Sequence, residues 1–126
     1  MERSIQQELF YLKNFFRFSN CNDYNWDSYF EDVFENYSED YFILLIESLI
    51  KDNLINEYDL ALELPYSKIG EKTIEHLKDH VDWDEASSES KLSEDFILKY
   101  KDNIDFEILK YNSNIPEDLK TLIEVI

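Results

Sequence analysis

The sequence predicts an all-α protein, a small helical bundle whose C-terminal end is built from short helix-turn-helix repeats. Apolar residues recur at the spacing of helix faces along most of the 126-residue chain. A single Gly and two Pro leave too few turn-forming residues for an all-β sandwich or barrel. Similar segments also recur every 23 residues in the second half of the chain. We expect about six to eight short helices.

The first expected helix covers residues 4–18 and carries an apolar stripe at helical spacing. Residues 19–22 break this pattern, and Asn22 or Asp23 is suited to cap the helix that follows. The second helix has apolar residues at i, i+3, i+4, i+7, i+8 and i+11 from Trp26 to Tyr37, which is a strong amphipathic pattern.

A third helix is expected to start after Ser38 and to run from Tyr41 to about Lys51. It is apolar on nearly every side, so we expect it to be buried. A short fourth helix, residues 57–64, ends before Pro65. We therefore divide the chain into an acidic and aromatic helical part, residues 1–64, and a helical-repeat part, residues 65–126, packed as one domain.

The repeat is visible as matched residues 23 positions apart. Copies begin near Gly70, Ser93 and Pro116, and Val81-Asp82-Trp83 matches Ile104-Asp105-Phe106. Each copy is expected to hold a helix, a tight turn and a shorter helix capped by Asp82 or Asp105. The last copy is reduced to one helix. A fixed period of this length is typical of stacked helical pairs.

Residues 60–126 resemble a known kind of repeat. The segment from Leu92 to Phe106, with its Leu-Ser-Glu-Asp-Phe-Ile start and its later Lys-Asp and Asp-Phe pairs, is similar to the "LSEDFI…KDxxDW" helical repeats of phages, large DNA viruses and some bacterial hosts. It differs at Phe106, where Trp is usual, and at residues 86–89, which are polar. The resemblance implies a helical-repeat fold and a viral or mobile-element origin. The whole protein resembles acidic phage inhibitors of the anti-CRISPR and DNA-mimic class.

Composition narrows the function classes. Asp and Glu number 29 against 12 Lys and Arg, which gives a formal net charge of −17. Leu, Ile, Phe and Val still make up about a third of the chain, enough to fill a core. Direct nucleic-acid binding is not expected, because it needs a basic surface. One cysteine, Cys21, and no signal peptide or spanning segment favour a cytoplasmic protein of the host cell.

An acidic stretch is the feature that most needs a functional explanation. No Lys or Arg occurs between Arg17 and Lys51. A row of four carboxylates at i, i+4, i+8 and i+12 along one helix is formed by Asp23, Asp27, Glu31 and Glu35. Neighbours at that spacing stand about 6 Å apart, close to the phosphate spacing of a nucleic-acid strand. Such a row can imitate a nucleic-acid backbone and enter a basic groove of a partner, with nearby tyrosines as anchors. The candidate partner-binding residues are Asp23, Asp27, Glu31, Asp32, Glu35, Glu39, Asp40, Tyr24 and Tyr37.

Catalytic and metal chemistry is poorly represented. His76 and His80 have zinc-ligand spacing, but they match polar positions of the next copy, so exposed histidines are the better interpretation. The Asp23-x-Asn25-x-Asp27 segment lacks the Gly and Glu that an EF-hand loop needs. Acidic composition produces carboxylate pairs by chance, and no nucleophile and base accompany them. We expect neither an enzyme nor a cofactor or metal.

The sequence favours a non-enzymatic inhibitor that blocks the nucleic-acid site of a basic host protein, such as a CRISPR effector or another defence nuclease. An immunity protein that neutralises a basic toxin nuclease has the same electrostatics and stays an alternative. A helical-repeat adaptor, binding through Trp83, Tyr100, Phe106 and Tyr111, is a second alternative. The sequence does not separate a steric block from locking of a conformation, and it does not give the oligomeric state.

Overall fold

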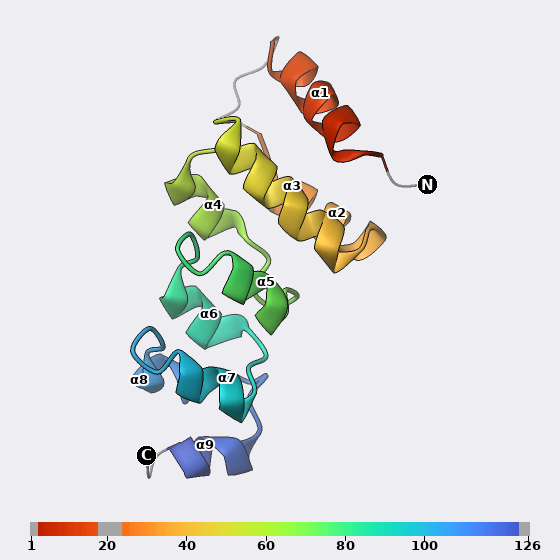
Figure 1. Cartoon of the computed structure of the whole chain (residues 1–126). Helices are drawn as coiled ribbons and strands as arrows, with labels where there is room; N and C mark the ends of the chain where they lie inside the picture. The colour runs from red at the N-terminus through yellow and green to blue at the C-terminus, as the bar shows by residue number, and fades with distance from the viewer. Residues whose placement is uncertain (1–2, 18–23, 124–126) are drawn as a thin grey trace. The chain divides into compact units, whose positions relative to one another are not determined.

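The fold was analysed in a computed structural model, which describes residues 3–17 and 24–123 (Figure 1). These residues contain nine helices and no strand, which confirms the all-α prediction with more helices than the six to eight expected. The chain divides into two compact units, unit 1 (Met1–Pro65) and unit 2 (Tyr66–Ile126). The helices are α1 (Ile5–Phe16), α2 (Trp26–Asn36), α3 (Glu39–Lys51), α4 (Glu57–Glu63), α5 (Glu71–His76), α6 (Trp83–Glu89), α7 (Glu94–Lys99), α8 (Phe106–Leu109) and α9 (Glu117–Ile123).

Helix α1 begins with a capping box. The Ser4 hydroxyl accepts the Gln7 N–H at 3.1 Å, and the Gln7 side chain accepts the Ser4 N–H at 2.9 Å. Both bonds satisfy donors that a helix start leaves without intrahelical partners. In unit 1, α1 packs on α3, and α2 packs on α3 and α4.

Helix α2 does not begin where the sequence suggested. Its N-cap is Asn25, whose side chain accepts the Ser28 N–H at 3.1 Å. The predicted caps Asn22 and Asp23 were therefore wrong for this helix, and both lie outside the described residues. Trp26, only 4% exposed, explains the later start, because the first residue of the helix enters the core.

Helix α3 is the buried helix of unit 1, as predicted. Six of its apolar or aromatic residues are buried, including Phe42, Leu45 and Ile46 with no exposed surface. The Ser38 hydroxyl caps it by accepting the Tyr41 N–H at 3.1 Å. Phe30 of α2 packs edge-on against Phe42, with ring centroids 6.0 Å apart. Burial of such apolar side chains favours folding of this unit.

Unit 2 repeats its backbone geometry every 23 residues. Helices α5 and α7 are both six residues long, and their C-caps Leu77 and Tyr100 have φ, ψ angles of −105°, 20° and −110°, 27°. The caps of the second helices, Asp82 and Asp105, adopt −84°, 106° and −89°, 107°. The same turn hydrogen bonds follow, from His80 to Leu77 and from Asn103 to Tyr100. The predicted period is therefore present in the described structure.

The lengths of the second helices differ from the prediction. In the second copy α8, with four residues, is shorter than α7, but α6 has seven residues and is longer than α5. The Asn112 side chain explains this, because it donates to the carbonyls of Ser87 and Ser90 at 2.8 Å each. These bonds satisfy the C-terminal end of α6, which can then extend for a further turn.

Candidate functional site

The candidate site is the acidic surface of unit 1, which we define as the six carboxylates that α2 and the start of α3 carry. Asp27, Glu31 and Glu35 lie at i, i+4 and i+8 on α2, and the buried residues of that helix occupy its other side. The predicted row of four is thus a row of three on α2, since Asp23 lies outside the described residues. The members of the acidic surface are Asp27, Glu31, Asp32, Glu35, Glu39 and Asp40.

Exposure separates these six residues. Asp27, Asp32, Glu35 and Asp40 are exposed, whereas Glu31 and Glu39 are half-buried. The Asn36 side chain donates to the Asp32 carboxylate at 3.0 Å and holds it in place. The last turn of α2 contains no basic residue, so the negative end of the helix dipole adds to the anionic potential there.

Glu39 and Asp40 also have a structural role. They occupy the first turn of α3, where the positive end of the helix dipole stabilises carboxylates by about 0.3–1 kcal/mol each. Helix stability is therefore a sufficient reason for the position of these two carboxylates, whether or not a partner protein binds them. Asp27 likewise lies in the first turn of its helix, α2, whereas Asp32 and Glu35 lie beyond the first turn and gain no such stabilisation.

The two candidate tyrosines are packed against rings of their own chain. The Tyr24 ring centroid lies 5.2 Å from that of Phe16 and 4.9 Å from that of Trp26. Partial burial raises the pKa of the Tyr24 hydroxyl above its ordinary value. Tyr37 packs against Tyr41, which is itself buried, with the two rings tilted by 38° and their centroids 4.7 Å apart. Tyr24 and Tyr37 are half-buried, so only part of each ring is open to a partner.

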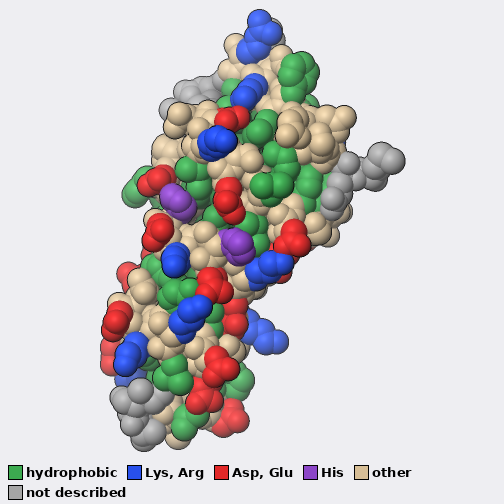
Figure 2. Space-filling model, viewed as in Figure 1, with side chains coloured by type: hydrophobic (Ala, Val, Ile, Leu, Met, Phe, Trp, Pro, Cys, Tyr) green, Lys and Arg blue, Asp and Glu red, His purple; other side chains and the backbone are tan. Residues whose placement is uncertain are grey.

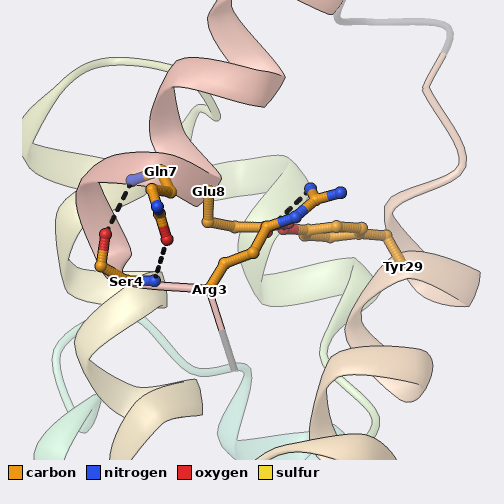
Figure 3. A network of polar contacts seen from close by, with 5 residues as sticks. All are labelled: Arg3, Ser4, Gln7, Glu8 and Tyr29. Atoms are coloured by element: carbon orange, nitrogen blue, oxygen red, sulfur yellow. Dashed lines mark hydrogen bonds and ion pairs between the residues drawn. The ribbon is translucent and has the colours of Figure 1, made fainter. Parts of the chain in front are cut away.

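A buried carboxylate of α1 that was not among the candidate residues binds a tyrosine of α2 (Figure 3). Glu8 of α1 is 3% exposed, accepts the hydroxyl proton of Tyr29 and pairs with Arg3 at 3.3 Å. Burial, then this hydrogen bond, raises the pKa of Tyr29 well above its ordinary value. A sequence signal existed, because Glu8 lies at a stripe position between Ile5 and Leu12.

Two ion pairs of unit 1 hold α1 in place. Arg3 pairs with Glu8, and Lys13 pairs with Asp52 at 3.0 Å. In unit 2 the Lys99 ammonium and the Tyr100 hydroxyl both donate to Glu75, which lowers the pKa of Glu75. Figure 2 shows Lys and acidic side chains interspersed over the visible face of unit 2.

The weaker candidates have other structural roles. Asn25 caps α2 and therefore stands at a helix start, outside any EF-hand loop. His76 is exposed and His80 is half-buried in unit 2, and Cys21 lies outside the described residues. Within residues 3–17 and 24–123, no three His, Cys, Asp or Glu side chains gather as a metal site would require.

The aromatic residues of the adaptor alternative do not share one open face. Trp83 of α6 lies 5.3 Å from Tyr100 and 6.3 Å from Phe96 of the next copy, measured between ring centroids. Tyr100 is buried and Phe106 is half-buried, whereas Tyr111 is 87% exposed. Trp83 and Tyr100 thus pack within unit 2, and Phe106 is half-buried. Only the Tyr111 ring of these four is largely exposed.

Unit 2 contains a cavity that the sequence did not predict. Its volume is about 510 Å³, and it lies between α8, the turn before it, and α9. Apolar side chains and lysines share its lining. The lining residues are Lys101, Asp102, Phe106, Glu107, Leu109, Lys110, Lys120 and Ile123.

Comparisons of the chain with protein-family models, with curated proteins and with solved structures find no match. Among the helices of the described ranges, none has the length and apolar character that crossing a bilayer requires.

Proposed function

We propose that this chain is a non-enzymatic inhibitor that presents the acidic surface of unit 1 to a basic, nucleic-acid-handling protein and blocks its nucleic-acid site. One observation carries the proposal. Exposed carboxylates lie along α2 and at the start of α3, inside a stretch from residue 18 to residue 50 that contains no Lys or Arg.

The spacing of these carboxylates has a cost that solubility does not require. Like charges at i, i+4 destabilise an isolated helix by about 0.2–0.5 kcal/mol per pair. Asp27, Glu31 and Glu35 form two such pairs on α2, and no Lys or Arg stands between them. A basic cleft that receives the row would offset this repulsion, and the net charge of −17 would speed the encounter of the two proteins.

The kind of partner follows from electrostatics and from the repeat resemblance. Proteins that bind nucleic acid carry basic grooves. A phage or mobile-element origin, which the repeats of unit 2 imply by resemblance, makes a CRISPR effector or another defence nuclease the favoured partner. An immunity protein against a basic toxin nuclease would use the same surface. The adaptor alternative is less favoured, because Trp83 and Tyr100 are occupied within unit 2.

The test is capture of the partner from host extract on immobilised protein, at low and at high salt, with identification by mass spectrometry. Capture of a basic nucleic-acid-handling protein, released by salt and displaced by added nucleic acid, supports the proposal. We expect the variant D27K/D32K/E35K, which reverses three exposed charges, to lose at least tenfold in affinity for that protein.

A matched variant controls for net charge. D84K/E94K/D95K reverses three exposed charges in the first turns of α6 and α7 of unit 2. It changes the net charge equally and should keep affinity within about threefold. Equal losses in both variants, a neutral or acidic partner, or capture that is insensitive to salt would each contradict the proposal.

A further inference from the structure

Helix α4 of unit 1 can be compared residue by residue with α6 of unit 2. Both helices have seven residues, and each begins at a residue whose side chain accepts a backbone N–H, Asn56 for α4 and Asp82 for α6. The fourth residue after the cap, Leu60 or Ala86, has no exposed surface. The two helices therefore turn the same position toward the core.

The outer face of α4 is apolar, whereas the outer face of α6 is polar. Tyr58 and Leu62, the second and sixth residues after the cap, are 74% and 51% exposed. Because they stand at i and i+4, they form one ridge on the side of the helix opposite Leu60, which we call the α4 ridge. The same positions of α6 hold Asp84 and Ser88, both exposed. A helix with this cap and this buried position therefore forms without an apolar pair on its outer face.

Two adjacent large apolar side chains in water suit a contact with another molecule. Apolar residues that stand singly are common on protein surfaces and need no explanation. Tyr58 and Leu62 are instead neighbours on one helix, and more than half of each side chain is exposed. Tyrosine is also enriched among the residues that dominate protein–protein binding. The α4 ridge is therefore suited to insert into an apolar surface.

The surroundings of the α4 ridge are anionic. Asp59 and Glu63 directly follow the two ridge residues and border the ridge on one side. The Asp59 carboxylate accepts the neutral side-chain amide of Asn56 at 2.7 Å, a bond that leaves its charge in place. The last turn of α4 contains no basic residue, so the helix dipole adds negative potential there. Residues 52–67 contain no Lys or Arg, and charge complementarity therefore favours a basic occupant.

We propose that the α4 ridge is a docking site for a basic amphipathic helix of another protein. The apolar stripe of that helix covers Tyr58 and Leu62, and its Lys or Arg side chains meet Asp59 and Glu63. The site uses residues of α4 alone, so it is distinct from the acidic surface that α2 and the start of α3 carry. The inference does not depend on the proposed function.

The probe is a synthetic peptide of about 18 residues, composed of Ala, Leu and Lys, with blocked termini. Its leucines recur at i, i+3, i+4 and i+7 and form one apolar face, and its lysines occupy the other face. Amide chemical shifts of the full chain are followed during titration. We expect the largest shifts around α4, and affinity at least tenfold above that of a peptide of the same composition whose leucines are spread around the helix.

Helix α6 is an internal control for binding by charge alone. Glu85 and Glu89 of α6 stand where α4 has Asp59 and Glu63, so two carboxylates border the outer face of either helix. The α6 amides should therefore stay unchanged at peptide concentrations that shift the α4 amides. Equal shifts of the two helices would show attraction by charge without the apolar pair and would overturn the proposal.

The variant Y58D/L62S gives α4 the outer residues of α6 and tests the apolar pair directly. It should weaken binding of the basic peptide at least tenfold, although it adds a negative charge. Y111S removes an aromatic side chain of unit 2 that is 87% exposed, and it should leave the affinity within twofold. The dispersion of the amide spectrum confirms that each variant is folded. Undiminished binding to Y58D/L62S overturns the proposal.

Other occupants give different results. A peptide with Gln in place of every Lys should bind at least fivefold more weakly, and equal binding of this peptide would overturn the basic character of the docked helix. If the α4 amides shift with protein concentration alone, a second copy of the chain covers the α4 ridge, which also overturns docking of another protein.

Discussion

The hydroxyl of Ser87 accepts the backbone N–H of Asp105 at 3.1 Å, and the hydroxyl of Tyr66 accepts the backbone N–H of Asp82, the residue one period before Asp105, at 2.8 Å. Each bond satisfies a donor at the start of a second helix by means of a group from an earlier part of unit 2. The carboxylates of Asp82 and Asp105 then cap the same helices by accepting two backbone N–H groups each. Asp105 therefore joins its helix start to the preceding copy, and Asp82 joins its helix start to the segment before the first copy.

Removal of either cap should destabilise unit 2. We expect D82A and D105A each to lower the free energy of unfolding by about 0.5–2 kcal/mol, because two N–H donors lose their acceptor. Urea unfolding followed by circular dichroism measures the change. S88A, at an exposed position of α6, is the control and should change stability by less than about 0.5 kcal/mol. Equal stability of D105A and S88A would contradict the role of the cap.

Alkaline pH should destabilise the protein partly through Tyr66. Burial raises the pKa of the Tyr66 hydroxyl from 10.0 to about 12, despite the opposing effect of the bond from the Asp82 N–H. Between these values the unfolded chain has lost a proton that the folded chain keeps, so stability falls as pH rises through this window and is fully present below it. The urea midpoint of Y66F should decline less steeply above pH 10 than that of the parent protein.

Tyr111 provides the matched comparison for Tyr66, because its side chain is 87% exposed. Y111F should retain the alkaline decline of the parent protein. An equally steep decline in Y66F and the parent protein would show that titration of Tyr66 contributes nothing.

The Tyr29–Glu8 bond should stabilise unit 1. Y29F leaves the buried Glu8 carboxylate without one of its donors, and we expect a loss of about 1–3 kcal/mol in the free energy of unfolding. Guanidinium unfolding measures it, with Y58F as control because Tyr58 is 74% exposed. A change in Y29F no larger than that in Y58F would refute this role. A double-mutant cycle with E8Q gives the coupling energy directly.

Gly70 offers a stabilising substitution. It caps α5 without a side-chain bond, whereas Ser93, one period later, accepts the Phe96 N–H at 3.3 Å. The Gly70 backbone angles of −92° and 178° suit any residue. We expect G70S to raise the free energy of unfolding by about 0.4–1 kcal/mol, since it adds a cap and restricts the unfolded chain. Thermal unfolding measures this gain, and a lower midpoint would mean that a side chain does not fit.

The repeat was predictable because its signals are local. Ser93, Asp82 and Asp105 are cap residues, and residue type with spacing is enough to locate them. The start of α2 was not predictable in this way, because Asn22, Asp23 and Asn25 are all suitable caps. Burial of Trp26 selects Asn25, and burial depends on the tertiary structure.

The site was predictable only in part. Exposure of Asp27, Asp32 and Glu35 follows from helix periodicity. The stripe position of Glu8 is a signal of burial, but its charge argues for exposure, and only its partner Tyr29, 21 residues away, decides between the two. The cavity beside α8 is lined by residues of α8, the turn before it and α9, and spacing within a single copy does not show which side chains meet there.

The hydrogen bonds between copies also constrain how the gene can change. The hydroxyl acceptor is not repeated with the aspartates, since Leu64 and Lys110 stand 23 residues before and after Ser87. A further copy of residues 93–115, inserted after Ile115, would therefore place its capping aspartate beside Lys110, and the new contact would lack the bond that Ser87 supplies to Asp105.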